Sequence, residues 1–106
     1  RKKEMIVTGG ENVYPAEVEQ IIAEHPEVEQ VVVVGAPDPK WGEAVAAAVV
    51  PRKGSCLTGE GLRSYLRGRL AAYKIPKAVL FMDELPKTPV GKIDRRAILR
   101  LFVQKD

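Results

Sequence analysis

Two apolar segments, VEQVVVV at residues 28–34 and EAVAAAVVP at residues 43–51, decide the fold of this chain. The first segment is continuous and β-branched, which indicates a buried strand. The second is rich in alanine, and a short apolar run of this kind is compatible with either a strand or a helix. Because the β-branched neighbour offers a pairing partner, we predict two adjacent strands joined by the loop GAPDPKWG at residues 35–42.

The residues before this strand pair predict a β-hairpin followed by a helix. In MIVTGGENVY, residues 5–14, the pair Gly9 and Gly10 separates two short β-favouring runs, which is typical of a hairpin turn. Pro15 suits the first position of a helix, where its missing N–H is not needed. This helix has one apolar face, made by residues at helical spacing: Val18, Ile21 and Ile22.

The residues after the strand pair predict a second helix, a third strand and a last helix. The second helix is amphipathic and runs to about Ala72. AVLFM at residues 78–82 predicts the third strand, and ELPKTPVGK at residues 84–92 predicts a loop. Asp94 can cap the last helix. The apolar positions are Leu62, Tyr65, Leu66 and Leu70 in the second helix, and Ile98, Leu101 and Phe102 in the last.

Together these elements predict an α+β fold, a small sheet with an N-terminal β-hairpin and about three helices packed on it. A chain of 106 residues fits one domain, residues 1–106. Its 45% hydrophobic and 29% charged residues are typical of a folded soluble protein and argue against intrinsic disorder.

Charge and cysteine content limit the classes of function. The net charge of +3 can attract phosphates but does not imply a nucleic-acid partner. A single cysteine, Cys56, excludes an internal disulfide, and no Cys or His spacing suggests a metal site, which agrees with a cytoplasmic protein. The longest apolar runs are far shorter than the roughly 20 residues of a membrane-spanning helix, so no transmembrane segment is predicted.

Lys92 is the first candidate functional residue. It follows a glycine in PKTPVGK, residues 86–92, just ahead of the last predicted helix. Two prolines stiffen this loop, and an ammonium group is a compact charge suited to phosphate oxygens. The residues alone leave two interpretations open, namely a phosphate-directed lysine and a surface lysine before a helix cap.

Further candidate binding residues also allow two interpretations. Gly9 and Gly10 either serve a turn that needs positive φ or let a ligand pass close to the backbone. Trp41 either stacks on a purine or packs over the edge of the domain. The segment AAYKIPKA places an aromatic residue beside two cations, either as a ligand contact or as a solvated helix end. The three residues concerned are Tyr73, Lys74 and Lys77.

The remaining chemically active residues are predicted to be structural or solvated. His25 stands alone at a helix end, and Cys56 lies in a Gly/Ser loop, so neither has a partner in the sequence pattern. The arginines of the last helix are predicted to form a solvated face: Arg95, Arg96 and Arg100.

Three long segments, taken in order, resemble one family. RKKEMIVTGGENVYPAEVEQII (1–22), GAPDPKWGEAVAAAVV (35–50) and LAAYKIPKAVLFMDELPKTPVGKIDRRAI (70–98) are similar to the small C-terminal domain of the acyl-CoA synthetases, within the adenylate-forming superfamily. The segment TGGENVYPAEVE, residues 8–19, is more similar to the acyl- and aryl-CoA ligases than to peptide-synthetase adenylation domains or luciferases. The resemblance covers nearly the whole chain.

The resemblance implies an ATP-dependent acid–CoA ligase that works in two half-reactions. A carboxylate attacks the α-phosphate of ATP to give an acyl-adenylate and pyrophosphate, and the thiol of coenzyme A then displaces AMP. In this family a large N-terminal domain of the same polypeptide holds ATP, Mg²⁺ and the acid, and the small domain rotates between the half-reactions. The chain would therefore be a mobile C-terminal domain, inactive alone, and the acid would be chosen outside it.

The resemblance also implies roles for individual residues. Lys92 matches the lysine that reaches the nucleotide during adenylation, and Gly9 and Gly10 match the hairpin that lines the passage for the pantetheine arm. Lys3 matches the hinge position, and because the chain begins just before it, we expect the small domain without its ATP-binding partner.

The nucleotide end of coenzyme A is assigned less directly. Trp41, Tyr73 and Lys77 match positions that contact it, by stacking on adenine or by cationic contact with its phosphates. Some relatives have an arginine where this chain has Ile75, so that phosphate contact would come from Lys74, Lys77 or another residue.

Two rival hypotheses differ from the CoA ligase. The first keeps the family but has an adenylation domain that loads a carrier protein, or a scaffolding relative without activity, although the presence of Lys92 and the two glycines argues against lost activity. The second is a non-catalytic basic module that binds nucleic acid. Such a module needs aromatic residues interleaved with basic ones on a sheet, and only 6% of this chain is aromatic.

Overall fold

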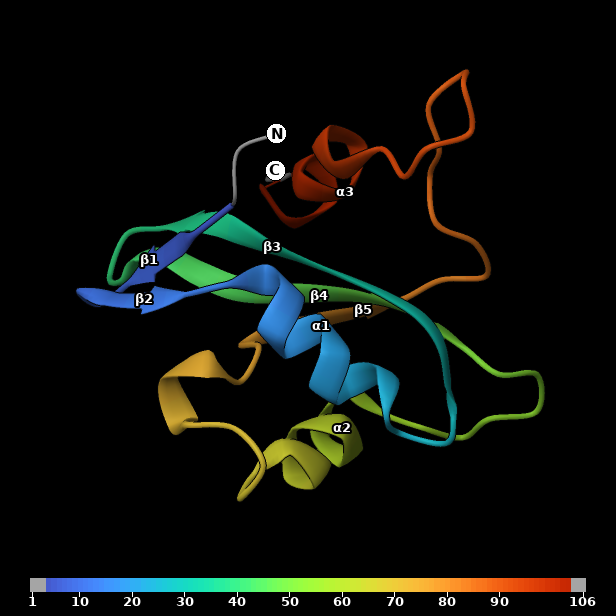
Figure 1. Cartoon of the computed structure of the whole chain (residues 1–106), viewed down its shortest axis with the longest axis horizontal. Coiled ribbons are helices and arrows are strands. Elements are labelled where there is room, and N and C mark those ends of the chain that lie inside the picture. Colours follow the sequence, from blue (N-terminus) through green and yellow to red (C-terminus); the bar gives the residue numbers. More distant parts are fainter. Residues whose placement is uncertain (1–3, 104–106) are drawn as a thin grey trace.

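A five-stranded sheet lies between two helical layers in the computed structural model, which describes residues 4–103 (Figure 1). One helix, α3, covers one face of the sheet, and α1 and α2 cover the other. The predicted α+β class, hairpin and three helices are confirmed. In chain order the elements are β1 (Ile6–Thr8), β2 (Glu11–Val13), α1 (Pro15–Ala23), β3 (Val28–Asp38), β4 (Gly42–Pro51), α2 (Gly59–Leu66), the 3-10 helix η1 (Ala72–Lys74), β5 (Ala78–Phe81) and α3 (Arg95–Val103).

The two segments that decide the fold form the long antiparallel pair β3–β4, in one register from Gln30 opposite Val50 to Asp38 opposite Gly42, with a shift of register between Val28 and Gln30. The predicted loop over residues 35–42 is wrong, because the strands continue through most of it and only residues 39–41 connect them. Pro37 is tolerated because β3 pairs with β4 alone among the described strands, and proline is compatible with an edge strand.

Both faces of the β3–β4 pair are buried, which explains why its sequence is continuously apolar. On β4, Val45, Ala47 and Val49 join the core beneath α1 and α2. The alternate residues of the same strand, Ala46 and Ala48, join the core beneath α3, together with other buried positions. The sheet thus separates two cores, as expected when successive side chains point to opposite faces.

The other strands make the sheet mixed. β1 and β2 form the predicted hairpin, and β1 meets β4 through a single antiparallel pair, Thr8 and Gly42. β5 runs parallel to β4, with residues 46–49 opposite residues 78–81. The hairpin therefore lies at the Gly42 end of β4, beside the short β3–β4 connection.

The second predicted helix is shorter than expected. It ends at Leu66 rather than near Ala72, because Arg67 is extended and Gly68, a poor helix former, follows it. Leu70 is nevertheless buried in the same core, since a turn closed by its N–H and the carbonyl of Leu66 brings it back. Buried residues can therefore continue at helical spacing beyond the last residue of the helix.

The last helix begins as predicted, with the N–H of Ala97 donating to Asp94 Oδ1 at 3.0 Å. Its apolar stripe differs from the prediction, because Leu101 is 43% exposed. Ile98 is fully buried, and Leu99, Phe102 and Val103 pack around the same core. No helix within residues 4–103 is long and apolar enough to cross a membrane.

Candidate functional site

The β1–β2 turn consists of Gly9 and Gly10, with φ of +57° and +87°. Positive φ at both central residues is the requirement of a type I′ hairpin turn, so the turn interpretation is sufficient for both glycines. The two differ in their surroundings. A Cβ on Gly9 would lie 2.8 Å from Cε3 of Trp41, whereas a Cβ on Gly10 would meet nothing within 4 Å. Gly9 thus makes room for Trp41, and Gly10 faces open space.

Trp41 is fixed at this end of the sheet by several contacts. Its carbonyl accepts a hydrogen bond from the Gly9 N–H at 2.8 Å, and its own N–H donates to Asp38 Oδ1 at 2.9 Å. The N–H groups of Trp41 and Lys40 hold the pKa of the Asp38 carboxyl below its ordinary value. The ammonium groups of Lys40 and Lys77 each lie 4.9 Å from the centre of the indole ring, which is a cation–π distance.

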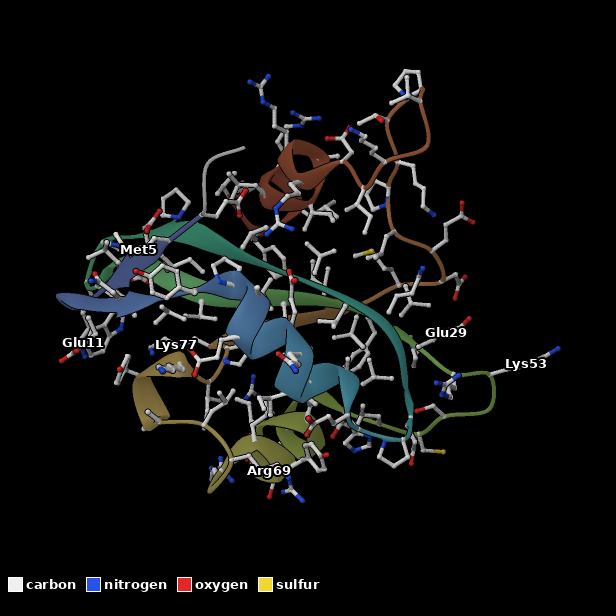
Figure 2. The ribbon with its side chains drawn as sticks, in the orientation of Figure 1. Met5, Glu11, Glu29, Lys53, Arg69 and Lys77 are labelled. Atoms are coloured by element: carbon white, nitrogen blue, oxygen red, sulfur yellow. The ribbon has the colours of Figure 1, made fainter. Side chains whose placement is uncertain are left out.

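An open pocket of about 290 Å³ lies between the hairpin, Trp41 and η1. It brings together four of the predicted binding residues, which are Gly9, Trp41, Tyr73 and Lys77. Figure 2 shows Lys77 and Glu11 on this side of the molecule, next to the hairpin. The pocket is also lined by residues that were not predicted: Thr8, Glu11 and Ala72.

Thr8 is the most informative of these additional residues. Its side chain is 3% exposed, and its hydroxyl oxygen has no hydrogen-bond partner within residues 4–103. A buried hydroxyl of this kind normally binds a protein group, a water or a ligand. The sequence carried one signal for it, a threonine directly before two glycines, but a buried site in a strand three residues long is not evident from the pattern.

Lys74 does not line this pocket. Its ammonium group binds both carboxylate oxygens of Glu17, at 2.9 and 3.0 Å, and this hydrogen bonding raises the pKa of Lys74 above its ordinary value. The pair fastens η1 to α1. Ile75, which stands where some relatives have arginine, packs partly buried against the core beneath α1 and α2. The phosphate role of Lys74 stays a prediction.

Lys92 stands at the end of a three-residue loop of Pro89, Val90 and Gly91. The N–H of Thr88 donates to the carbonyl of Lys92 at 2.7 Å, and the N–H of Gly91 donates to the carbonyl of Thr88 at 2.9 Å. Gly91 has φ of +90°, as in a type I turn followed by a left-handed residue. The Lys92 side chain is exposed, so a hydrogen-bonded turn presents its charge to the outside.

We call residues 82–94 the Lys92 loop, and the pocket between the hairpin, Trp41 and η1 the hairpin pocket. The two lie at opposite ends of the domain (Figure 1). The loop over residues 82–94 leaves the far end of the sheet, near α3, while the β1–β2 turn projects from the other end. None of the loop residues lines the hairpin pocket. Lys3, the predicted hinge residue, lies outside the described residues.

His25 and Cys56, for which no functional role was predicted, differ in their surroundings. His25 contacts the Tyr65 ring at 4.5 Å between centroids, and its Nδ1 accepts from the N–H of Glu27. Cys56 is exposed. The prediction of a solvated arginine face is wrong for Arg95. Its guanidinium donates to the carbonyl of Val33 and pairs with the carboxylates of Glu4 and Glu19.

The described part of the chain offers no metal centre of its own. Within residues 4–103, no group of three or more His, Cys, Asp or Glu side chains is arranged to hold a metal ion.

Known proteins with similar sequences and structures identify the family of this chain. A family model, the AMP-binding enzyme C-terminal domain, matches residues 17–92. Indoleacetate–CoA ligase from Aromatoleum aromaticum is 49% identical over 105 residues, covering 99% of this chain and 21% of that protein. Feruloyl-CoA synthase from an Amycolatopsis species is 52% identical over 102 residues, covering 96% of this chain and 21% of that protein.

Among solved structures, amide bond synthetase McbA from Marinactinospora thermotolerans has a TM-score of 0.91 and 39% identity, covering 98% of this chain and 21% of that one. The chain therefore spans about a fifth of the length of the relatives it matches. With a family model that covers most of its length and relatives this similar, the chain belongs to the AMP-binding enzyme C-terminal domain family.

Proposed function

We propose that residues 1–106 are the mobile C-terminal domain of an AMP-forming acid–CoA ligase, acting with a large N-terminal domain of the same polypeptide. The family match and the CoA-ligase relatives support this proposal. The observation that carries it is the position of two exposed elements, the Lys92 loop and the hairpin pocket, at opposite ends of one domain. We place the reaction in the cytoplasm, in agreement with a single cysteine that excludes an internal disulfide.

Lys92 serves the first half-reaction, in which the carboxylate oxygen bonds to the α-phosphorus of ATP and pyrophosphate leaves. The charge that builds up on the phosphorus oxygens needs a cation that is already oriented, and an ammonium group meets this need. The Lys92 loop supports the role because its turn is closed by its own hydrogen bonds. The backbone around Lys92 is therefore ordered before the nucleotide is met, and only the exposed side chain has still to be oriented.

The hairpin pocket serves the second half-reaction, in which the CoA sulfur bonds to the acyl carbon and AMP leaves. Two features fit a narrow arm rich in amides. Gly9 lines the pocket without a side chain of its own, and the Thr8 hydroxyl is a buried group without a partner in the described chain. Lys77 supplies a cation for the CoA phosphates, and the partly exposed Trp41 ring supplies an aromatic face.

A rotation of the domain follows from this separation. One rigid unit cannot place two opposite ends in the same active site at once, so the domain must turn between the half-reactions. ATP, Mg²⁺ and the acid are assigned mainly to the N-terminal domain. Mg²⁺ there would neutralise phosphate charge.

The proposal is tested with Lys92→Met in the full-length enzyme, measured separately in each half-reaction. We expect acid-dependent ATP–pyrophosphate exchange to fall by at least about a hundredfold, as for removal of one preorganised charge-stabilising group. Formation of the CoA thioester from supplied acyl-adenylate should change by less than about twofold, an effect worth under half a kcal/mol. Lys87→Met is the matched control, since Lys87 is exposed in the same loop. Unchanged exchange in Lys92→Met would refute the assignment.

A second candidate acceptor is an amine. The structural neighbour with a TM-score of 0.91 is an amide bond synthetase, so the same domain fold occurs with a different acyl acceptor. The two functions are separated by offering CoA, a phosphopantetheine-bearing carrier protein and a simple amine to the preformed acyl-adenylate. A CoA thioester as the dominant product supports the ligase, whereas a dominant amide or carrier-bound thioester would replace it.

A further inference from the structure

Arg95 is the centre of an ionic cluster that the proposed chemistry does not use. Its Nη2 donates to the carbonyl of Val33 at 2.6 Å and lies 2.9 Å from Glu4 Oε1. Its Nη1 lies 3.6 Å from Glu19 Oε2, and that same oxygen accepts the N–H of Val33 at 2.8 Å. The Arg95 side chain is 28% exposed, which is low for an arginine on the first turn of a terminal helix.

The cluster joins four segments that are distant in the sequence. Arg95 opens α3 on one face of the sheet, and Glu19 belongs to α1 on the other face (Figure 1). Val33 lies between them on the edge strand β3, and its N–H and C=O are both satisfied by the two side chains. The fourth segment contains Glu4, directly before β1. The guanidinium therefore connects both helical layers around the open edge of the sheet.

An arginine is better suited to this place than a lysine. The planar guanidinium directs several N–H groups in fixed directions, so one side chain can bind three acceptors on different segments. The arrangement is also demanding, because Nε is buried and has no partner within residues 4–103. A lysine ammonium would have to choose among the same acceptors from a flexible stem.

The sequence positions of Arg95 and Glu4 relate this cluster to the proposed mechanism. Arg95 comes three residues after Lys92 and directly after the base of its loop, which is closed by the Asp94 N–H donating to the carbonyl of Pro86 at 2.9 Å. Glu4 comes one residue after Lys3, the predicted hinge. The ion pair of Arg95 and Glu4 is thus a direct link between the stem of the Lys92 loop and the segment next to the predicted hinge.

We propose that Arg95 is a positioning residue for the adenylation half-reaction. Its guanidinium holds the stem of the Lys92 loop in a set orientation to the segment through which the domain turns, so that Lys92 arrives at the α-phosphate in a reactive geometry. Arg95 itself does not touch the substrate. The inference rests on the proposed role of Lys92 and on the predicted hinge at Lys3, and extends them to the residues that set the direction of Lys92.

The first test compares Arg95→Met, Lys92→Met and Arg100→Met in the full-length ligase. Arg100 is an exposed arginine on the same helix, which makes it a matched control. We expect Arg95→Met to lower ATP–pyrophosphate exchange by about tenfold to a hundredfold, the usual effect of a small misplacement of a reacting group. Thioester formation from supplied acyl-adenylate should stay within about twofold, as expected if only the first half-reaction uses this geometry. Arg100→Met should leave both unchanged.

The outcomes separate the inference from the proposed function. If Lys92→Met abolishes exchange and Arg95→Met leaves it intact, the proposed function stands and the positioning role is refuted. A parallel loss of both half-reactions and of thermal stability in Arg95→Met would also refute it, since that is the result of a purely structural role. If Lys92→Met leaves exchange intact, the proposed function fails, and the positioning role fails with it.

A second variant keeps the test decisive if Arg95→Met does not fold. Glu4→Ala removes one arm of the cluster at a side chain that is 46% exposed, so the fold should tolerate it. We expect it to lower exchange by several-fold and to have no further effect in an Arg95→Met background, because both changes break the same link. Arg95→Lys should restore part of the exchange rate. Additive losses in the double variant would overturn the link between Arg95 and Glu4.

Discussion

Replacing Gly9 by alanine should destabilise the domain much more than replacing Gly10, although the two are neighbours in one turn. Both have positive φ, and placing alanine in a left-handed conformation costs about 1 to 2 kcal/mol. Only at Gly9 does the new Cβ collide with a neighbour, at 2.8 Å from Cε3 and 3.1 Å from Cζ3 of Trp41. Overpacking of this kind adds about 1 to 3 kcal/mol. We therefore expect about 2 to 5 kcal/mol for Gly9→Ala and about 1 to 2 kcal/mol for Gly10→Ala.

The size of the difference depends on whether Trp41 can move away. Its backbone is bonded to Gly9 and to Asp38, and the ammonium groups of Lys40 and Lys77 lie over its ring. These contacts hold the ring against the turn, so the added methyl group should not be accommodated without a loss of stability. Relief by a small shift of the indole would instead reduce the cost of Gly9→Ala toward that of Gly10→Ala.

The assay is urea unfolding of the 106-residue chain, followed by circular dichroism and by the fluorescence of Trp41, its single tryptophan. Each kcal/mol should move the midpoint by about 0.3 to 1 M urea, given the slopes of small domains. Gly54→Ala is the control, because Gly54 has φ of +83° and a Cβ there meets nothing within 4 Å. It should match Gly10→Ala. A midpoint for Gly9→Ala equal to or above that of Gly10→Ala would refute the reasoning.

Two further predictions concern the same end of the sheet. In the full-length ligase, Lys77→Met should raise the KM for CoA by roughly tenfold, the value of one charge-assisted contact, with exchange unchanged. Lys40→Met is its control, since Lys40 lies equally close to Trp41 but does not line the pocket, and an equal effect of both would contradict the phosphate role. Asp38 has a lowered pKa in the folded state, so its contribution to stability is present above its ordinary pKa of about 3.9 and is lost as pH falls through the lower folded value. Trp41 fluorescence should therefore change in that acid range, in parallel with the NMR signal of the Asp38 carboxyl group. The change should be absent from the Asp38→Asn variant. A pKa of Asp38 in the folded state at or above its ordinary value would contradict this prediction.

Local signals in the sequence predicted much of the fold because they act over a few residues. The two glycines require a turn with positive φ, Pro15 favours the start of a helix, and Asp94 accepts a hydrogen bond from the next turn. Continuous apolar runs predicted β3 and β4, because burial on both faces removes polar positions. The ends of elements were less predictable, since the loop before β4 shortened to residues 39–41 and α2 ended at Leu66.

The candidate site was partly predictable in the same way. The resemblance to the acyl-CoA synthetases named Gly9, Trp41, Tyr73 and Lys77, and the fold brings these residues to one pocket. It could not indicate that the Gly9 position makes room for Trp41, since that depends on a contact between residues 32 positions apart in the chain. The buried hydroxyl of Thr8 also becomes visible only when the pocket is formed.

By itself, then, the sequence determined the type and order of the elements and the chemical groups that the chain can offer. Only the tertiary structure decided which charges stay available. Lys74 is paired with Glu17 across 57 positions, and Arg95 binds the carbonyl of Val33 across 62, whereas Lys92 is exposed at the end of its loop. All three look alike as cations in the sequence. What separates them is a nearby acceptor supplied by a distant segment, and that proximity exists only once the sheet and its two helical layers have assembled.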